Sequence, residues 1–300
     1  MKNSALRRIT IAIAVGAILI LAPRFLTIVQ IRMVNEIAYF ALFAVSFNLL
    51  FGYAGLLSFG HASYFGLGAY LTALSLKHVA GMPLVLSIVL GGIAAAIGGA
   101  VIGFFCVRRK GAYFALLTLA FNQFLWAIAW KWREVTGGED GIGKIVPRKP
   151  LNLGIMTLDP TQVEGMYYLT IVLVFICLVL GWYLTKTPFG NTVQAIKVNE
   201  ERADFLGYNV NRAKLWIFTV AAFFAGIAGS LFALFQDFVA PSAISMAMST
   251  EVLFMAFLGG TGSFFGPILG AAIFVYFTDW ISSIAERWEF ILGEIGRAHV

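Results

Sequence analysis

The amino-acid sequence predicts an all-α polytopic membrane protein with about eight transmembrane segments. The chain of 300 residues is 60% hydrophobic and 12% charged, and its mean hydropathy is +0.87. A soluble domain carries roughly 25% charged residues. The charges also fall into a few separated loops with long apolar stretches between them, a pattern that a large soluble core does not produce.

The apolar stretches have lengths that suit membrane crossing. Residues 37–76 contain no Asp, Glu, Lys or Arg, and this run is about twice the roughly 20 residues that one helix needs, so it suffices for two crossings. Each of the other charge-free runs has about the length of one crossing. They are residues 9–23, 78–107, 111–130, 165–185, 215–236 and 252–278. We therefore expect a single transmembrane domain over residues 1–293.

The first apolar run resembles a signal peptide, and the last seven residues resemble a sequencing artefact. The run at residues 9–23 follows basic residues, as a signal peptide does, but Pro23-Arg24-Phe25 is not a small-residue cleavage site. We expect this run to be retained as a membrane anchor. Residues 294–300 read like one translated frame of a sequencing adapter, and we expect them to be an artefact of a truncated gene.

Basic residues indicate the orientation in the membrane. Three clusters, in residues 1–8, 108–110 and 186–214, hold 11 Lys or Arg against 3 Asp or Glu. The outer loops, residues 24–36, 77, 131–164 and 237–251, hold 8 basic and 8 acidic residues, of which residues 131–164 contribute five of each sign. By the positive-inside rule the three clusters and the amino terminus are cytoplasmic, and residues 131–164 form an external loop. The net charge of +6 then reflects topology, and no nucleic-acid partner is expected.

Glycine interrupts two of the expected membrane segments, at residues 52–60 and at residues 259–267. Backbone that leaves the helix at membrane depth is tolerated only inside protein or along a water-filled path. Paired interruptions in the two halves of a chain are typical of a transport path near the membrane midplane. We therefore predict a transport protein. The residues expected at its translocation path are Asn48, Gly52, Gly55, Ser58, Gly60, His61, Gly259, Gly260, Gly262, Gly266 and Pro267.

Several polar residues within the apolar runs have a structural interpretation beside a functional one. His61 can contact a substrate carboxylate, or it can serve as a neutral hydrogen-bonding group where glycine-rich backbone leaves carbonyls unpaired. For Asn48, Asn122 and Gln123 we expect interhelical hydrogen bonds first. No metal site, disulfide or catalytic residue is predicted, because the sequence has no HExxH, GxSxG, CxxC or GxxxxGK[ST] motif.

The cytoplasmic segment 186–214 contains a short capped helix. Asn199 can cap a helix that begins at Glu200, and Gly207 can end it in the left-handed conformation. So short a helix is unstable alone and needs a partner, for which Ala203, Phe205 and Leu206 offer apolar contacts. The residues assigned to this helix and its caps are Asn199, Glu200, Glu201, Arg202, Ala203, Phe205, Leu206 and Gly207.

Four motifs in this order resemble one family. They are NLLFGYAG at 48–55, SFGHA at 58–62, NEERADFLG at 199–207 and LGGTGS at 258–263 followed by Gly266-Pro267. Over roughly residues 9–284 the chain resembles the membrane permease subunits of bacterial branched-chain amino-acid ABC importers. The similarity is greatest to the type whose partner is a second, similar permease.

The resemblance implies an inner-membrane location, an ABC-importer permease architecture and a set of partners. These partners are a second permease, two cytoplasmic ATPase subunits and a periplasmic substrate-binding protein, all assembled in the lipid bilayer. The ATPases would bind ATP, so no cofactor is expected in this chain. Residues 200–206 would correspond to the coupling helix that contacts an ATPase, and residues 131–164 would meet the binding protein.

Other functions are considered beside this one. A proton- or sodium-coupled secondary transporter would need intramembrane Asp, Glu or Arg in a relay, and the central runs hold none of these residues, which leaves His61 as the candidate for such a relay. A related ABC permease for urea or amides would share all the features above. The substrate, and whether the pore is formed by two copies or by a mixed pair, do not follow from the sequence.

Overall fold

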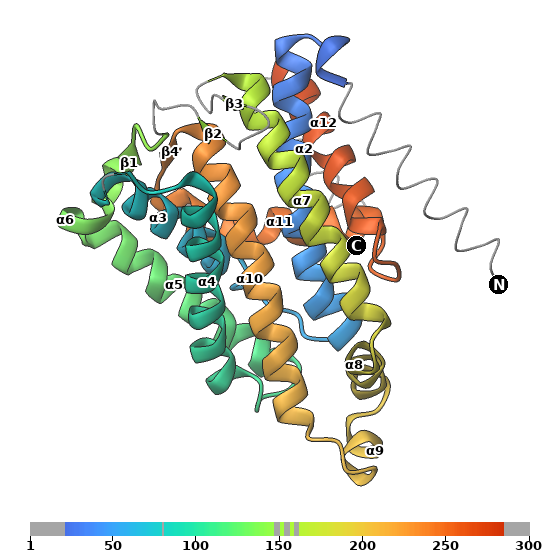
Figure 1. The fold of residues 1–300 in the computed structure, drawn as a ribbon. Coiled ribbons are helices and arrows are strands. Elements are labelled where there is room, and N and C mark those ends of the chain that lie inside the picture. Colours follow the sequence, from blue (N-terminus) through green and yellow to red (C-terminus); the bar gives the residue numbers. More distant parts are fainter. Residues whose placement is uncertain (1–21, 80, 147–150, 153–156, 159–161, 285–300) are drawn as a thin grey trace.

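The computed structural model describes residues 22–79, 81–146, 151–152, 157–158 and 162–284, and within them it is a helical bundle (Figure 1). The expected anchor run up to residue 21 and the suspected artefact at 294–300 lie outside the described residues. The long helices are α2 (Ile28–Asn48), α3 (Ala62–His78), α4 (Leu84–Cys106), α5 (Ala112–Lys131), α7 (Val163–Lys186), α10 (Val210–Gln236), α11 (Met246–Gly259) and α12 (Gly266–Ile284).

Five helical spans are long and apolar enough to cross a membrane, namely α2 with its extension, α4, α5, α7 and α10. The helices α11 and α12 are shorter and also apolar. This architecture confirms the predicted all-α polytopic fold. The shorter elements are η1 (Ala22–Arg24), η2 (Leu49–Tyr53), α6 (Arg133–Thr136), η3 (Gly138–Asp140), β1 (Ile142–Gly143), β2 (Leu151–Asn152), β3 (Thr157–Leu158), α8 (Pro188–Val198), α9 (Glu200–Phe205), β4 (Phe238–Val239) and η4 (Pro241–Ile244).

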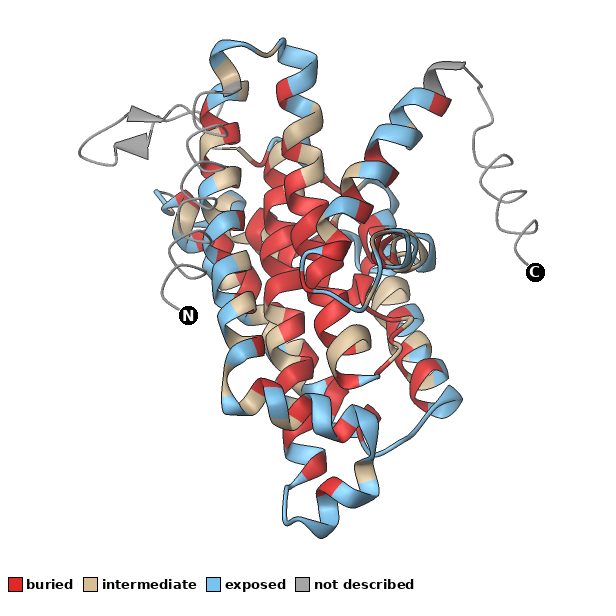
Figure 2. Ribbon diagram, turned by 90° about the vertical axis from the view of Figure 1, so that its right-hand side faces the viewer, coloured by how far each residue is buried: buried red, intermediate tan, exposed pale blue. Residues whose placement is uncertain are grey.

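Close contacts between small residues hold the centre of the bundle together. Helix α10 packs on α3 and α4, and a Cβ atom added at Gly68 would collide with the backbone of Gly226. The same holds for Gly229, whose Cα lies against the backbone of Phe65. In lipid, where hydrophobicity gives little drive between helices, such approach of backbones supplies the packing. Figure 2 shows the resulting buried core in the middle of the molecule.

The apolar run 252–278, which the charge pattern counts as one crossing, is divided into two helices. α11 ends at Gly259 and α12 begins at Gly266, and the two helices pack against each other. A Cβ at Gly259 would meet the backbone of Gly266, and a Cβ at Gly270 would meet that of Met255. Glycine at these positions therefore lets the chain reverse and the two helices pack with their backbones close together.

The two ends of the bundle differ in structure. At one end, called the α9 end below, lie α8, α9 and the loop between α4 and α5 (Figure 1). At the other end, residues 131–146 form α6, η3 and β1, and β1 pairs antiparallel with β4. The Asp237 carboxylate accepts hydrogen bonds from the backbone N–H groups of Ile145 and Val146, at 2.6 and 2.8 Å. The described part of the expected external loop is therefore an ordered structure attached to α10.

Candidate functional site

The first interruption begins where α2 changes into the π-helical turn η2. Beyond this turn the backbone N–H of Leu56 reaches the carbonyl of Leu50, six residues earlier, at 2.9 Å, a wider spacing than the five residues of a π-helix. Gly55 follows with a φ of +71°, which favours glycine, and the chain turns back until α3 begins at Ala62. The predicted interruption is confirmed, but the helix continues through residues 52–54 and breaks only from Gly55.

The second interruption joins α11 to α12. Gly260 has a φ of +85°, and its N–H donates to the carbonyl of Phe257 at 3.1 Å, which ends α11. The Ser263 hydroxyl then accepts a hydrogen bond from the N–H of Gly266 at 2.9 Å, which begins α12. Pro267 suits the first turn of a helix, where no backbone N–H is needed. The second predicted break is also confirmed.

The two interruptions contact each other, although they are far apart in the sequence. The Asn48 side chain, at the end of α2, donates from Nδ2 to the carbonyl of Ser263 at 3.0 Å. A Cβ at Gly52 would collide with the carbonyl of Thr261 and with the Asn48 amide. The sequence predicted a shared role for the two segments, and the structure brings them together at one place.

The predicted path residues differ in exposure. In the first interruption Asn48, Ser58, Gly60 and His61 are buried, Gly52 is half-buried and Gly55 is exposed; in the second, Gly266 and Pro267 are buried, Gly259 is half-buried, and Gly260 and Gly262 are exposed. The exposed members of both segments therefore remain accessible in the single subunit, whereas the buried ones pack inside it.

His61 lies inside the protein and makes a structural contact. Its Nε2 atom is 2.8 Å from the hydroxyl of Ser46, and its ring stacks on Phe43 with centroids 5.4 Å apart. Asn122, on α5, accepts a hydrogen bond from the Ser63 hydroxyl at 2.7 Å. The interhelical hydrogen bond expected for Asn122 is confirmed, and the contact of His61 with Ser46 is of the structural kind among its two alternatives. Gln123 differs from that expectation, because it is exposed on α5.

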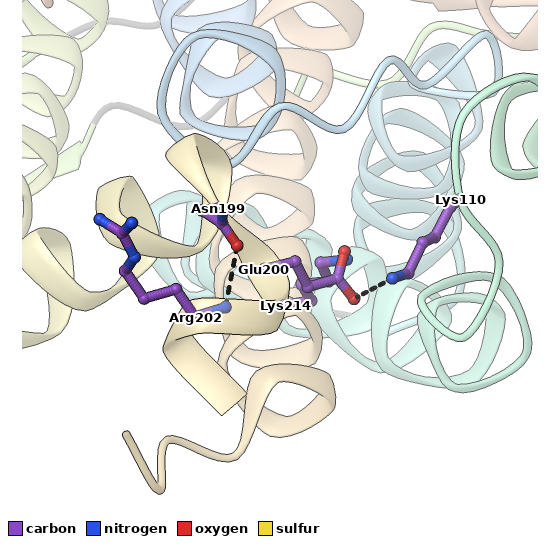
Figure 3. A network of polar contacts seen from close by, with 5 residues as sticks. All are labelled: Lys110, Asn199, Glu200, Arg202 and Lys214. Carbon is purple, nitrogen blue, oxygen red and sulfur yellow. Dashed lines mark hydrogen bonds and ion pairs between the residues drawn. The ribbon is translucent and has the colours of Figure 1, made fainter. Parts of the chain in front are cut away.

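The short helix at the α9 end is capped as predicted. The Asn199 side chain accepts a hydrogen bond from the N–H of Arg202 at 2.8 Å, and α9 begins at Glu200 (Figure 3). Gly207, with a φ of +87°, ends the helix. The chain then turns so that the N–H of Tyr208 reaches the carbonyl of Ala203 at 3.2 Å. Local capping signals thus define both ends of this six-residue helix.

The apolar residues of α9 divide between two faces, which corrects the expectation that all of them await a partner. Ala203 is buried in a small cluster with Ile196 of α8 and with Val210 and Ala213 of α10. Phe205 and Leu206 point away, and their exposures are 92% and 71%. A helix this short has too few turns for the sequence to assign its faces. The chain's own α8 and α10 therefore supply the packing that stabilises α9.

Glu200 attaches α9 to the membrane-spanning helices, a contact that the sequence did not indicate. Its carboxylate lies 2.7 Å from the ammonium of Lys214 on α10 and 3.4 Å from that of Lys110, between α4 and α5 (Figure 3). The Lys214 side chain is only 6% exposed. The sequence interpretation of Lys110 as part of a topology signal missed this pairing, since no fixed spacing links these residues.

No group of three or more His, Cys, Asp or Glu residues that could hold a metal ion occurs in the described part of the chain. Cys106 and Cys177 are free and buried. What the geometry offers is mechanical: two touching breaks in membrane helices, and a rigid capped helix attached to several of those helices.

Comparisons with known proteins agree with this geometry. A family model described as "Branched-chain amino acid transport system / permease component" matches residues 30–293. The high-affinity branched-chain amino acid transport system permease protein LivM of Escherichia coli strain K12 is 31% identical over 274 residues, which cover 85% of this chain and 64% of that protein. This chain therefore spans slightly less than two thirds of that relative.

Of two more distant relatives, one has the same printed substrate class and the other has a different one. The probable branched-chain amino acid transport permease protein LivM of Methanocaldococcus jannaschii is 25% identical over 285 residues, covering 83% of this chain and 80% of that protein. The xylose transport system permease protein XylH of Escherichia coli strain K12 is 28% identical over 183 residues, covering 55% and 46%. No solved structure matches the chain. With the family model covering most of its length, the chain belongs to the family of permease components of branched-chain amino acid transport systems.

Proposed function

We propose that this chain is the transmembrane permease subunit of an ATP-driven importer for branched-chain amino acids. In this proposal separate ATPase subunits bind and hydrolyse ATP at the α9 end, which faces the cytoplasm of a bacterial cell with an inner membrane. The amino terminus is on the same side. The single observation that carries the proposal is α9 itself, a capped and internally packed helix whose apolar tip is exposed within the described part of the chain.

The tip of α9 has the properties of a docking surface for an ATPase subunit. Phe205 and Leu206, at the end of α9, are 92% and 71% exposed, and Val198, at the end of α8, is 86% exposed; all three lie in a segment that is too polar to enter lipid. Burying each large apolar side chain is worth about 1.5–3 kcal/mol, so leaving these three in water is unfavourable. The pairing of Glu200 with Lys214 holds α9 against α10. A force on the tip therefore reaches the membrane helices.

A second permease subunit is proposed to pack on α5. This is the least buried of the five spans, with 28% of its apolar window buried in the single chain. Its exposed face carries the Gln123 amide near the middle of the span, whereas the exposed residues of α4 and α7 at that depth, such as Ile97 and Ile176, are apolar. An amide without a partner is costly in lipid. A similar subunit, or the water-filled path between the two, would relieve that cost.

At the opposite end, the ordered external loop is proposed to receive the periplasmic substrate-binding protein. The contacts of Asp237 with Ile145 and Val146 attach this loop to α10. α10 in turn packs on α3, which follows the first interruption. The binding protein, the translocation path at the two interruptions and the ATPases are thus connected through one helix in this proposal.

The test begins with affinity purification of the tagged chain from its native membrane. We expect ATPase subunits and a second permease to co-purify with it. In proteoliposomes the complex should take up leucine only when ATP and the binding protein are present. Uptake that persists without ATP and stops when the proton or sodium gradient is collapsed would instead establish a secondary transporter. Preference for urea or a short amide over leucine would assign the related substrate class.

A Phe205→Asp substitution tests the docking surface directly. We expect it to reduce the co-purified ATPase at least about tenfold, since it places a charge in an apolar contact. Phe238→Asp, an equally drastic change of a half-exposed aromatic residue at the other end of the molecule, is the control and should leave the ATPase bound. Equal ATPase recovery with both variants would contradict the assignment of the α9 tip.

A further inference from the structure

A lysine connects the segment before α9 directly to the first interruption. Lys197 lies at the end of α8, two residues before the cap Asn199, and its ammonium donates a hydrogen bond to the carbonyl of Gly52 at 2.6 Å. The two residues are 145 positions apart in the sequence. The family motifs quoted above include Gly52 but not Lys197, so the contact is visible only in the structure.

The carbonyl of Gly52 is well suited to receive a positive charge. The carbonyls of Leu50 and Phe51 accept hydrogen bonds from the N–H groups of Ala54, Gly55 and Leu56. Gly52 lies in the last turn of the helix formed by α2 and η2, where carbonyls lack partners within the helix. This end of a helix carries partial negative charge, and a hydrogen bond from an ammonium is stronger than one from a neutral donor.

The aliphatic part of Lys197 also fits the shape of the interruption. A Cβ added at Gly55 would come within 3.2 Å of the Lys197 Cγ atom, so the side chain lies across the turn. Gly52 itself lies against the carbonyl of Thr261, and Asn48 donates to Ser263. Lys197 therefore contacts the first interruption at the residue that touches the second.

On its other side, Lys197 is joined rigidly to α9. Asn199 is at once the last cap of α8 and the first cap of α9, so no flexible linker separates the two helices. Ile196, next to Lys197, packs on Ala203 of α9 in the cluster that α8, α9 and α10 share. A displacement of α9 must therefore displace the Lys197 ammonium together with it.

We propose that Lys197 is a positioning residue for transport, which transmits movement of α9 to the first interruption through its hydrogen bond with Gly52. This inference rests on the proposed function. Glu200 anchors α9 to α10 and to the loop at Lys110, whereas Lys197 reaches the translocation path itself. Loss of Lys197 should leave the ATPases assembled and able to hydrolyse ATP, but less substrate should be taken up for each ATP hydrolysed.

The experiment measures ATP hydrolysis and leucine uptake in the same proteoliposomes, which contain the complete importer. For Lys197→Met we expect the amount of leucine taken up per ATP hydrolysed to fall roughly tenfold, as the loss of a charged hydrogen bond implies. Lys197→Arg keeps the positive donor and should retain most of the wild-type ratio. Lys186→Met removes another exposed lysine at the same end of the molecule and should leave the ratio unchanged.

The outcomes separate this inference from the proposed function. If the wild-type complex shows no ATP-dependent uptake, the proposed function fails. If the wild-type complex is active and Lys197→Met keeps its uptake per ATP, Lys197 has no role in transmission. Should Lys197→Met fail to assemble, Lys197→Gln is compared with Lys197→Arg at equal assembly. A lower ratio for Gln than for Arg supports the inference, and equal ratios overturn it.

Discussion

The two glycine interruptions are similar in composition but are held in different ways. The first lies between α2 and α3, is largely buried, and contacts α5 as well, since a Cβ at Gly60 would collide with the carbonyl of Thr118. The second is a reversal between two short helices, and its tip, around Gly262, is exposed with open space around it. Lys197 contacts the first interruption and not the second.

This difference indicates which segment is fixed and which has room to move. The first interruption is surrounded by its own chain and by the residue that joins it to α9. The second is held by the packing of α11 and α12 on each other and on α2, by the buried Phe264 side chain and by the hydrogen bond from Asn48 to Ser263. We infer that movement enters at the first interruption and passes to the second across the contact between them.

The largest difference in the free energy of unfolding is expected between the variants Gly52→Ala and Gly262→Ala. The added methyl group at Gly52 meets the backbone carbonyl of Thr261, which cannot rotate away, so we expect a loss of about 3 kcal/mol in stability, at the upper end for overpacking. At Gly262 nothing lies within 4 Å, and the change should stay within about 0.5 kcal/mol.

Thermal unfolding of the purified subunit in detergent measures both variants of this pair. A clear decrease in the unfolding midpoint for Gly52→Ala, with Gly262→Ala close to wild type, would sharpen the comparison. If both variants unfold at the wild-type temperature, the two interruptions do not pack as described.

The positions of the breaks could be predicted from the sequence, but their contact could not. Glycine and proline signal where a helix ends, and Asn199 and Gly207 mark a helix by local hydrogen bonding, so these features follow from nearby residues. The contact of Asn48 with Ser263 spans 215 positions and leaves no periodic pattern.

Interactions of the charged residues were equally hidden from the sequence. The basic residues of segments 108–110 and 186–214 indicate topology, which is a statistical property of whole loops. The pairing of Lys110 and Lys214 with Glu200, and of Lys197 with a backbone carbonyl, depends on how distant helices pack. For the same reason, the burial of Ala203 could not be predicted, because it depends on neighbours from α8 and α10.

An intermediate loss of stability is expected for Asn48→Ala, which removes the hydrogen bond between the two interruptions. The carbonyl of Ser263 loses its donor, and we expect a destabilisation of about 1–2 kcal/mol. Gln123→Ala is the matched control, because it also replaces an amide by a methyl group but at an exposed position of α5. Scanning fluorimetry of the isolated subunit should show a lower midpoint for Asn48→Ala alone. A decrease of the same size in both variants would mean that the hydrogen bond contributes nothing specific.

The smallest and most selective effect on stability concerns the positive-φ glycine of each interruption, Gly55 in the first and Gly260 in the second. Alanine in the left-handed conformation costs about 1 kcal/mol or slightly more, and at Gly260, with nothing within 4 Å, this strain is the whole expected effect on stability. At Gly55 the added methyl group also presses on the stem of Lys197. We therefore expect similar unfolding midpoints for the two variants but lower uptake per ATP for Gly55→Ala alone.

Combining Gly55→Ala with Lys197→Met should add no further loss of uptake per ATP, because the contact between these two residues is already absent. A full additional loss would show that Gly55 acts independently of the lysine.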